Sequence, residues 1–254
     1  MRMDLGLDRR VALVTGASGA IGHATARTLA REGALVAATW YQAETEARAL
    51  VETIEQEGGT ALAVHLDLTD PASITRAARR IRRDLGAVTV LVANAVSWPP
   101  READTAGALA ASFAANTTGT VALIDEALPD MRAAGWGRIV VISTDLVDQP
   151  LPGPVAYPAA KAALEGVARV MAAREARHGI LTNVVRPGFT LTDRVRSLPD
   201  HGQAVIDAEA GRTPTGRLSY PEDIAATVVY LGSAANGHVN GEVVSVSGGR
   251  GLTR

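Results

Sequence analysis

The sequence predicts a single α/β domain in which a parallel sheet is covered by helices on both faces. Short runs rich in β-branched residues alternate with longer segments rich in Ala, Arg and Glu, which is the pattern of repeated βα units. A length of 254 residues with 47% hydrophobic and 20% charged residues is that of a globular domain with a full core. The first of the β-branched runs leads directly into a glycine-rich turn.

The predicted strands share runs of aliphatic and β-branched residues with Gly, Asp or Asn close to at least one end. In chain order we expect them at residues 11–15, 35–40, 61–66, 88–93, 138–143, 181–185 and 242–246, which makes a seven-stranded, mostly parallel sheet. The first two expected helices lie at 21–31 and 44–57, and helices also separate the later strands. Gly58 and Gly59 end the second helix as a C-cap does.

Residues 188–220 do not fit this alternation. The stretch between Pro187 and Pro221 is too long for an ordinary connection. Long irregular segments of this kind often carry binding residues or close over a site. We therefore interpret 188–220 as a lid or substrate-binding segment of one domain that spans residues 1–254.

The turn after the first strand indicates a dinucleotide ligand. Residues 15–22 read TGASGAIG and open into a helix. Glycines here allow a tight turn and let backbone N–H groups approach a pyrophosphate at the positive end of the helix. A plain turn with glycines for geometry alone is the alternative, but strand, turn and helix come in the required order. The predicted cofactor contacts in this turn are Gly16, Ser18, Gly19, Ile21 and Gly22.

Tyr157 and Lys161 are the residues that we expect to carry chemistry. Side chains four residues apart lie on one face of a helix. An ammonium about 4 Å from a phenol stabilises the phenolate by up to roughly 4 kcal/mol at an effective dielectric of ~20. Such a phenol can donate or accept a proton near neutral pH, as carbonyl reduction and alcohol oxidation require. The same spacing also occurs by chance on ordinary amphipathic helices, so the pair gains its weight from the rest of the chain.

Charge and composition argue against several classes of function. The formal net charge of −2 gives no support for binding to nucleic acid or to an anionic membrane. The chain has no cysteine and its five histidines show no metal-ligand spacing, so we expect no disulfide, no thiolate nucleophile and no metal. No run approaches about 18 apolar residues and the start lacks the apolar stretch of a signal peptide, so we expect a cytoplasmic protein.

Further motifs follow along the chain in a definite order. After the glycine turn come Asp67-Leu68, Asn94-Ala95, Asn116, Tyr157 with Lys161, Pro187-Gly188 with Thr192, and Ser247-Gly248-Gly249. Over nearly the whole chain this order resembles the short-chain dehydrogenase/reductase family, and within it the group that includes 3-oxoacyl-(acyl-carrier-protein) reductases. The resemblance implies a Rossmann-type, doubly wound domain in which hydride passes between a nicotinamide and a carbonyl or alcohol carbon.

The resemblance also implies roles for individual residues. Tyr157 would donate or accept the proton, Lys161 would hold the ribose hydroxyls, and Asn116 would hold a water on the proton path. Further cofactor contacts would be Trp40, Tyr41, Asp67, Leu68, Asn94, Ala95, Pro187, Gly188, Thr190 and Thr192. The substrate residues that we expect are Val96, Trp98, Asp145, Leu151 and Phe189. A homotetramer or homodimer would pair the helices around 105–133 and 155–177.

Several positions depart from the family pattern, three of them at the expected site. The family's catalytic serine falls on Thr144, with Ser143 beside it. Threonine keeps the hydroxyl that polarises a carbonyl, although its methyl group stiffens χ1. We expect Thr144 to act, with Ser143 as the alternative. Ala20 stands at a usual glycine of the turn, where a Cβ costs little at negative φ and much at positive φ. Val96 places a branched side chain where the cofactor would run close to the backbone.

The end of the second strand favours NADP(H) over NAD(H). No carboxylate precedes Glu44 there to bind the ribose 2′-hydroxyl of NAD and repel a 2′-phosphate. Neither residue 19 nor residue 41 is an Arg or Lys that would grip that phosphate, so hydroxyl groups would have to hold it.

The sequence therefore predicts an NADP(H)-dependent oxidoreductase of the ketoreductase or alcohol dehydrogenase type, with Tyr157 as general acid or base. Two alternatives stay open. One is a protein of this fold that binds the cofactor without net redox activity. The other is a non-redox lyase or isomerase that uses Tyr157 and Lys161 for proton chemistry. The sequence leaves the substrate and the direction of the reaction open.

Overall fold

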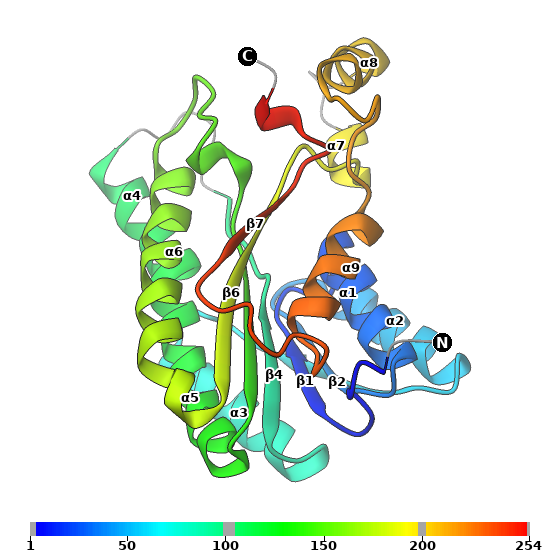
Figure 1. Cartoon of the computed structure of the whole chain (residues 1–254), viewed down its shortest axis with the longest axis vertical. Helices are drawn as coiled ribbons and strands as arrows, with labels where there is room; N and C mark the ends of the chain where they lie inside the picture. The colour runs from blue at the N-terminus through cyan, green and yellow to red at the C-terminus, as the bar shows by residue number, and fades with distance from the viewer. Residues whose placement is uncertain (1–3, 99–104, 198–201, 253–254) are drawn as a thin grey trace.

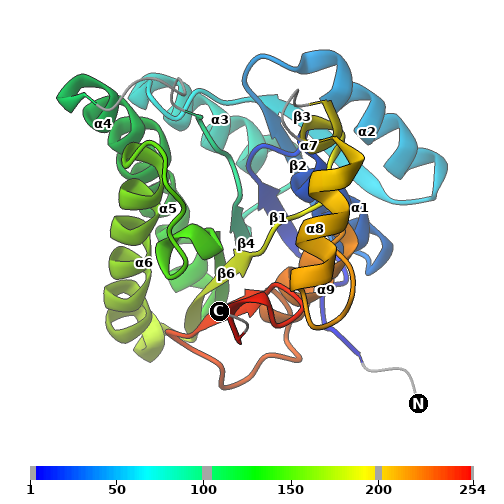
Figure 2. The same ribbon diagram turned by 90° about the horizontal axis from the view of Figure 1, so that it is seen from above.

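The centre of the computed structural model, which describes residues 4–98, 105–197 and 202–252, is a parallel sheet between two layers of helices (Figures 1 and 2). Within these residues seven strands lie in the order β3-β2-β1-β4-β5-β6-β7, and each neighbouring pair is parallel. The strands are β1 (Val11–Val14), β2 (Leu35–Trp40), β3 (Thr60–His65), β4 (Val88–Ala93), β5 (Gly137–Ile142), β6 (Ile180–Pro187) and β7 (Val243–Val246). The predicted fold is confirmed, and this sheet is parallel throughout rather than mostly parallel.

Helices cover both faces of the sheet, as predicted. One layer holds α1 (Ala20–Arg31), α2 (Glu44–Gln56) and α9 (Pro221–Leu231), and the other holds α3 (Pro71–Asp84), α5 (Gly119–Ala134) and α6 (Ala156–Glu175). The shorter elements are α4 (Ala106–Phe113), the π-helical turn η1 (Ala114–Thr118), the 3-10 turns η2 (Asp145–Val147), η3 (Ala176–His178) and η4 (Arg250–Leu252), and the helices α7 (Asp193–Ser197) and α8 (Gln203–Arg212) of the long segment after β6.

Two hydrophobic cores lie on opposite sides of the sheet because successive strand residues point to opposite faces. Val11 and Leu13 of β1 pack with the layer of α3, α5 and α6, whereas Ala12 and Val14 pack with the layer of α1, α2 and α9. Burial on both faces is the reason why the central strands are nearly continuous apolar runs.

The winding of the chain reverses between β1 and β4. From β1 the sheet continues to β2 and β3 on one side, and from β4 to β7 on the other. The loops that follow the two strands therefore separate and leave a crevice at the carboxyl ends, where doubly wound sheets bind ligands. Gly16 lies just after β1 and Asn94 just after β4, so the fold brings two predicted cofactor residues to this crevice.

The described residues of the predicted lid segment contain the helices α7 and α8. Arg250 of η4 donates to Oε2 of Glu209 in α8 at 2.5 and 2.8 Å, which connects this segment to residues near the C-terminus. Residues 198–201 of the predicted lid lie outside the described residues.

The helical run Ala106–Ala134 is long and apolar enough to cross a membrane by length and composition, with a mean hydropathy of 1.3 in its best 18-residue window. The sequence reading did not single it out because polar residues such as Asn116 interrupt the run. In the structure 39% of that window is buried, and Leu123, Ile124 and Leu128 pack in the core. Core helices pass the same test, so the run is weak evidence for a membrane span.

Candidate active site

A cleft of about 850 Å³ opens at the carboxyl ends of β1, β2 and β4. Its walls come from the glycine turn, the ends of these strands, and the first residues of α7 and α9. The predicted site residues that line it are Gly16, Ser18, Gly19, Ile21, Trp40, Tyr41, Leu68, Asn94, Ala95, Thr192, Val96 and Trp98. The structure thus brings together most of the predicted cofactor contacts.

The glycine turn is held by very close backbone contacts. A Cβ on Gly22 would lie 2.3 Å from the carbonyl oxygen of Gly16, and Gly16 itself has φ of +62°. The side-chain amide of Asn94 donates to the carbonyl oxygens of Thr15 and Gly16 at 2.9 and 3.1 Å. The hydroxyl oxygen of Thr15 accepts from the backbone N–H groups of Asn94 and Ala95 at 2.9 and 2.8 Å. Asn94 therefore fixes the shape of the turn as well as lining the cleft.

The two substitutions in the cofactor region leave the cleft open. Ala20 is the first residue of α1, and Arg9 is the only non-glycine residue with positive φ in the described part of the chain, so the Cβ of Ala20 adds no strain. Gly19 has φ of −87° and ψ of 159°, which other residues also adopt. Val96 lines the cleft with 41% of its surface exposed.

Aromatic rings stand at the end of β2. The register of β2 and β3 pairs Trp40 with His65, and their rings meet edge to face at 4.7 Å. The ring of Tyr41 lies 6.1 Å from the same imidazole. The sequence analysis did not predict His65 at this position, which follows from the register of β2 and β3.

Seven predicted cofactor residues are not among those that line the cleft: Gly22, Asp67, Tyr157, Lys161, Pro187, Gly188 and Thr190. The carboxylate of Asp67 accepts from the N–H and hydroxyl of Thr69 at 2.8 and 2.7 Å, so it stabilises a turn, and Leu66 lines the cleft instead. The hydroxyl of Thr190 donates to the Gly188 carbonyl oxygen at 2.9 Å. Pro187 ends β6, and the Gly188 N–H donates to Val246 of β7 at 2.9 Å. Thr192 does line the cleft, and its hydroxyl oxygen also accepts the N–H of Val195 at 3.2 Å, which caps α7.

Tyr157 and Lys161 lie in the first turns of α6, with only 8% and 2% of their surfaces exposed. The Lys161 ammonium donates to the carbonyl oxygen of Ile142, the last residue of β5, at 2.8 Å. It lies 6.0 Å from the centre of the Tyr157 ring. Burial lowers the pKa of Lys161 from 10.5 to about 8. A cation and a phenol thus share a site that is shielded from water.

The two hydroxyls that follow β5 have different partners. The buried Ser143 donates to a carboxylate oxygen of Glu165 at 2.5 Å. Thr144 accepts the N–H of Leu146 at 3.3 Å, and its side chain also hydrogen-bonds the carboxylate of Asp145. The Thr144 hydroxyl must therefore turn from Asp145 before it can donate to a substrate, and the choice of Thr144 over Ser143 stays a prediction.

Asn116 lies in the π-helical turn η1, and both the oxygen and the nitrogen of its side-chain amide form hydrogen bonds. Its amide oxygen accepts from the N–H of Ser97 and its amide nitrogen donates to the Ser97 carbonyl oxygen, both at 2.9 Å. Next to Ser97, the ring of Trp98 lies 4.4 Å from that of Tyr157 at an angle of 37°. Asn116 therefore holds the segment that carries Trp98, a residue that both lines the cleft and covers Tyr157.

The other predicted substrate residues, Asp145, Leu151 and Phe189, are not among those that line the cleft. Asp145 is half-buried directly after Thr144. Burial raises the pKa of Asp145, while the charge of Arg250 and a hydrogen bond with Thr144 act in the opposite direction. Phe189 is half-buried after β6, and Leu151 is mostly exposed.

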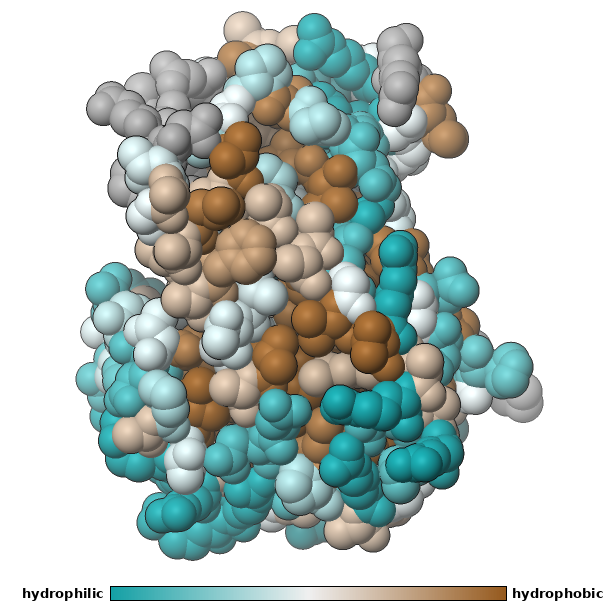
Figure 3. All heavy atoms as spheres, turned by 90° about the vertical axis from the view of Figure 1, so that its left-hand side faces the viewer, coloured by the Kyte–Doolittle hydropathy of each residue, from teal (hydrophilic) through white to brown (hydrophobic). Residues whose placement is uncertain are grey.

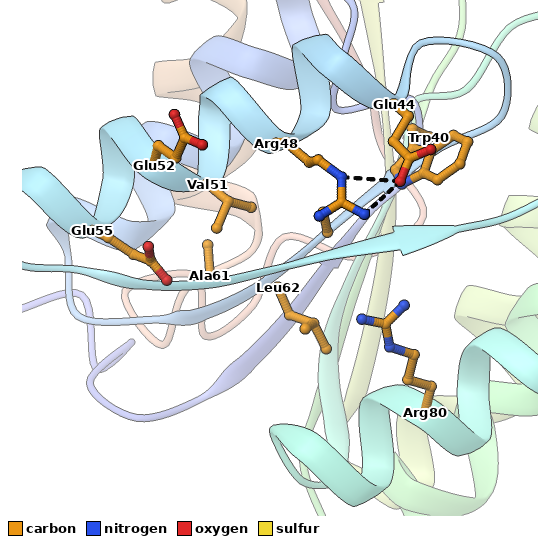
Figure 4. Close-up of a pocket in the computed structure, with 10 residues that line it drawn as sticks. Trp40, Glu44, Arg48, Val51, Glu52, Glu55, Ala61, Leu62 and Arg80 are labelled. Carbon is orange, nitrogen blue, oxygen red and sulfur yellow. Dashed lines mark hydrogen bonds and ion pairs between the residues drawn. The ribbon is translucent and has the colours of Figure 1, made fainter.

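A second groove, of about 280 Å³, lies on the outer side of β3 (Figure 4). Arg48 and Glu44 form an ion pair at 2.6 Å along α2 on one side of the groove, and Arg80 lies on the far side of Leu62. It shares only Trp40 with the cleft and contains none of the residues around Tyr157. We assign the chemistry to the cleft.

Comparison with known proteins agrees with this geometry. A family model described as enoyl-(acyl carrier protein) reductase matches residues 16–250. The chain is 38% identical over 246 residues to cis-4-hydroxycyclohexanecarboxylate dehydrogenase of Sinomonas cyclohexanicum, covering 94% of this chain and 96% of that one. It is 34% identical over 253 residues to 3-oxoacyl-(acyl-carrier-protein) reductase of Escherichia coli strain K12, with 96% and 98% covered. The chain belongs to the short-chain dehydrogenase/reductase family.

A solved member of this family shares the whole fold. It is a gluconate 5-dehydrogenase from Burkholderia cenocepacia J2315 in complex with NADP and tartrate, with a TM-score of 0.89, 30% identity, and 99% of this chain and 98% of that one covered. The protein is therefore an NAD(P)-dependent oxidoreductase, and the predicted family and enzyme class are confirmed.

Proposed function

We propose that this short-chain dehydrogenase/reductase uses NADP(H) to reduce a carbonyl or oxidise a secondary alcohol, with Tyr157 as general acid or base. The observation that carries the proposal is the position of Trp98, which lies between the cleft and Tyr157. This residue lines the cleft and stacks on Tyr157, while Lys161 joins the helix of Tyr157 to the strand that ends beside Thr144. A nicotinamide in the cleft would thus lie next to an acid and a carbonyl-polarising hydroxyl.

The residues present fit a dinucleotide. The turn leaves no room for a side chain at Gly16 or Gly22, and its backbone leads into the first residues of α1. NADP(H) is favoured because no carboxylate follows β2 before Glu44, and because the related gluconate 5-dehydrogenase was solved with NADP. No Arg or Lys lines the cleft within the described residues, so we propose that hydroxyls and the rings at the end of β2 hold the adenosine end.

Each catalytic residue then has a separate task. Bound NADPH supplies the hydride. Thr144 donates a hydrogen bond to the carbonyl oxygen and Tyr157 protonates it. Lys161, which is mainly an ammonium below pH 8, stabilises the phenolate that remains and is placed to hold the ribose hydroxyls. In the oxidative direction Tyr157 accepts the proton of the alcohol.

Asn116 would contribute through its backbone carbonyl and not through its side chain. Because the side chain is used by Ser97 and Ser112, we propose that any water on the proton path is held by the backbone carbonyl of Asn116. A π-helical turn shifts the hydrogen-bond pattern of a helix and is frequent at functional sites. In the structure that carbonyl accepts a long bond, 3.4 Å, from the Thr120 hydroxyl.

The remaining predictions are also proposals. Residues 1–254 would form one NAD(P)-binding domain with 188–220 as its lid, in the cytoplasm. Self-association would use the face of α4 and α6, where hydrophobic side chains gather (Figure 3) and Val155 and Val170 are 54% and 64% exposed. A sedimentation run that gives a monomer at all concentrations would rule out this interface.

The substrate class stays broad in this proposal. The related enzymes are named for a cyclohexanecarboxylate, an acyl-carrier-protein thioester and gluconate. In this chain Val96 and Trp98 give the cleft an apolar part, and the half-buried Asp145 directly follows Thr144, which supports a small molecule with both apolar and polar parts. Val96, Trp98, Asp145, Leu151 and Phe189 stay the predicted substrate contacts.

The test is a titration with NADPH and NADH followed by a panel of ketones and secondary alcohols with product identification. We expect micromolar binding that favours NADPH, and oxidation of one NADPH for each carbonyl reduced. Preference for NADH by more than about tenfold, equivalent to 1.4 kcal/mol, would contradict the cofactor assignment. Product formation without a change in nicotinamide redox state would contradict the reaction.

A further inference from the structure

We propose that Glu165 and Arg186 are a positioning pair that holds Thr144 and the loop 145–149 in register with Tyr157. The inference rests on the proposed function, because it assigns the pair to the site of carbonyl reduction. Neither residue touches the cleft, so both would act through the residues that they hold.

The pair is buried and makes two parallel contacts. Arg186 Nε donates to Oε1 of Glu165 at 2.7 Å, and Nη2 donates to Oε2 at 2.5 Å. The exposed fractions of the two side chains are 9% for Arg186 and 5% for Glu165. The same Oε1 also accepts from the Ser143 hydroxyl at 2.5 Å. Bidentate contacts of this kind fix orientation as well as charge.

The contacts join α6 to the end of β5 at two successive residues. Tyr157, Lys161 and Glu165 are spaced by four residues on one face of α6. Lys161 holds the carbonyl oxygen of Ile142, and Glu165 holds the hydroxyl of Ser143. Thr144 is the next residue, so its distance from Tyr157 is set by these two bonds.

Arg186 extends this connection to the loop beside the substrate. Its Nη1 pairs with the carboxylate of Asp148, whose side chain is 61% exposed. Arg186 also directly precedes Pro187 and Gly188 at the end of β6. One guanidinium therefore links α6, β6 and the loop that follows Thr144.

Stability alone is a weak reason for such a pair. A buried ion pair costs desolvation, and apolar residues of similar volume are often as stable or more stable. The chain contains a matched control on the same helix. Glu175, at the other end of α6, has a 1% exposed side chain and accepts from Arg132 at 2.7 and 2.8 Å and from Arg174 at 2.6 Å. Loss of Glu175 removes a comparable buried carboxylate far from the reacting groups.

The experiment compares Glu165→Gln with Glu175→Gln in the full chain. We expect Glu165→Gln to lower kcat for ketone reduction by about 10- to 100-fold, because misplacement by about 1 Å has effects of this size. The Kd of NADPH should stay unchanged. Glu175→Gln should leave kcat nearly unchanged, whatever either substitution does to the Tm. Asp148→Asn should raise KM for the ketone more than it lowers kcat.

Amide hydrogen exchange of residues 143–149 is the second measurement, and it needs no turnover. Exchange should be faster in Glu165→Gln and unchanged in Glu175→Gln. Equal exchange in both variants, or equal loss of kcat, overturns the inference. If Glu165→Gln does not fold, Ser143→Ala takes its place and is compared with Glu175→Gln in the same two measurements. A wild-type protein without turnover contradicts the proposed function, whereas the exchange result still decides this inference.

Discussion

Two regions at the carboxyl ends of the strands are built in different ways. One is proposed to bind the cofactor and the other to carry the chemistry. At the ends of β1 and β4, on the cofactor side, the contacts are between backbone atoms and small side chains, and a Cβ on Gly22 would lie 2.3 Å from a carbonyl oxygen. At the ends of β5 and β6, on the catalytic side, the contacts come from the buried charged side chains Lys161, Glu165 and Arg186. The cofactor side should therefore respond most to added volume, and the catalytic side to changes of charge and hydrogen bonding.

The largest effect is expected on the cofactor side from Gly22→Ala. The added Cβ would also approach the Asn94 amide at 2.7 Å and the Ala17 Cα at 2.9 Å, so the turn must move. We expect a loss of NADPH affinity of about 100-fold or more, as overpacking by about 3 kcal/mol would give. The control is Gly19→Ala, whose Cβ would have an ordinary contact at 3.5 Å. Equal affinities for the two variants in a calorimetric titration would contradict this difference.

On the catalytic side, Thr144→Val removes a hydroxyl and keeps the shape of the side chain. We expect kcat to fall by about 10- to 100-fold, near the lower range for loss of one stabilising donor. Thr144→Ser should keep most of the activity. If Thr144→Val is as active as the wild type in steady-state kinetics, Thr144 does not polarise the carbonyl.

The charge of Lys161 predicts the pH dependence. Because burial lowers its pKa to about 8, the ammonium is present below that pH and is lost as the pH rises through it. We expect kcat/KM for reduction to fall about tenfold per pH unit above about pH 8. In Lys161→Arg any remaining activity should persist to higher pH, since Arg stays protonated. If kcat/KM of the variant falls at the same pH as that of the wild type, the decrease comes from the titration of a group other than Lys161.

The smallest expected effect comes from Gly19→Arg, which adds a cation to the cofactor side. The negative φ of Gly19 and the room at its Cβ accept a side chain. A charge-assisted contact with the 2′-phosphate should tighten NADPH binding about tenfold and leave NADH binding nearly unchanged. Equal gains for both nucleotides in parallel titrations would show that the new side chain meets some other part of the cofactor.

The same contrast explains what the sequence could predict. The seven strands and the glycine turn follow from local patterns, and the predicted bounds of the strands differ from the observed ones by at most two residues. The contacts of the turn join residues 78 to 80 positions apart, but these residues lie just after β1 and β4, which are neighbours in the sheet. The conformation of Ala20 needed the structure, since its φ cannot be derived from the residue type.

The catalytic side was harder to predict because its contacts depend on how a helix packs against the sheet. Glu165 and Arg186 are 21 residues apart and meet only when α6 packs beside β6. On the cofactor side two contacts were also missed, since His65 reaches Trp40 through strand register and Asp67 turns toward Thr69 instead of the cleft. Charged residues that form buried pairs look like surface residues in the sequence, so no pattern distinguished them.

The central claim is that Tyr157 transfers the proton in an NADPH-dependent carbonyl reduction. The most direct measurement is single-turnover oxidation of bound NADPH in wild type and in Tyr157→Phe, with NADPH affinity determined on the same samples. We predict unchanged affinity and a rate that falls by about 100- to 10,000-fold, the range for loss of a general acid. A Tyr157→Phe variant that binds NADPH and reduces the ketone at the wild-type rate would contradict the account.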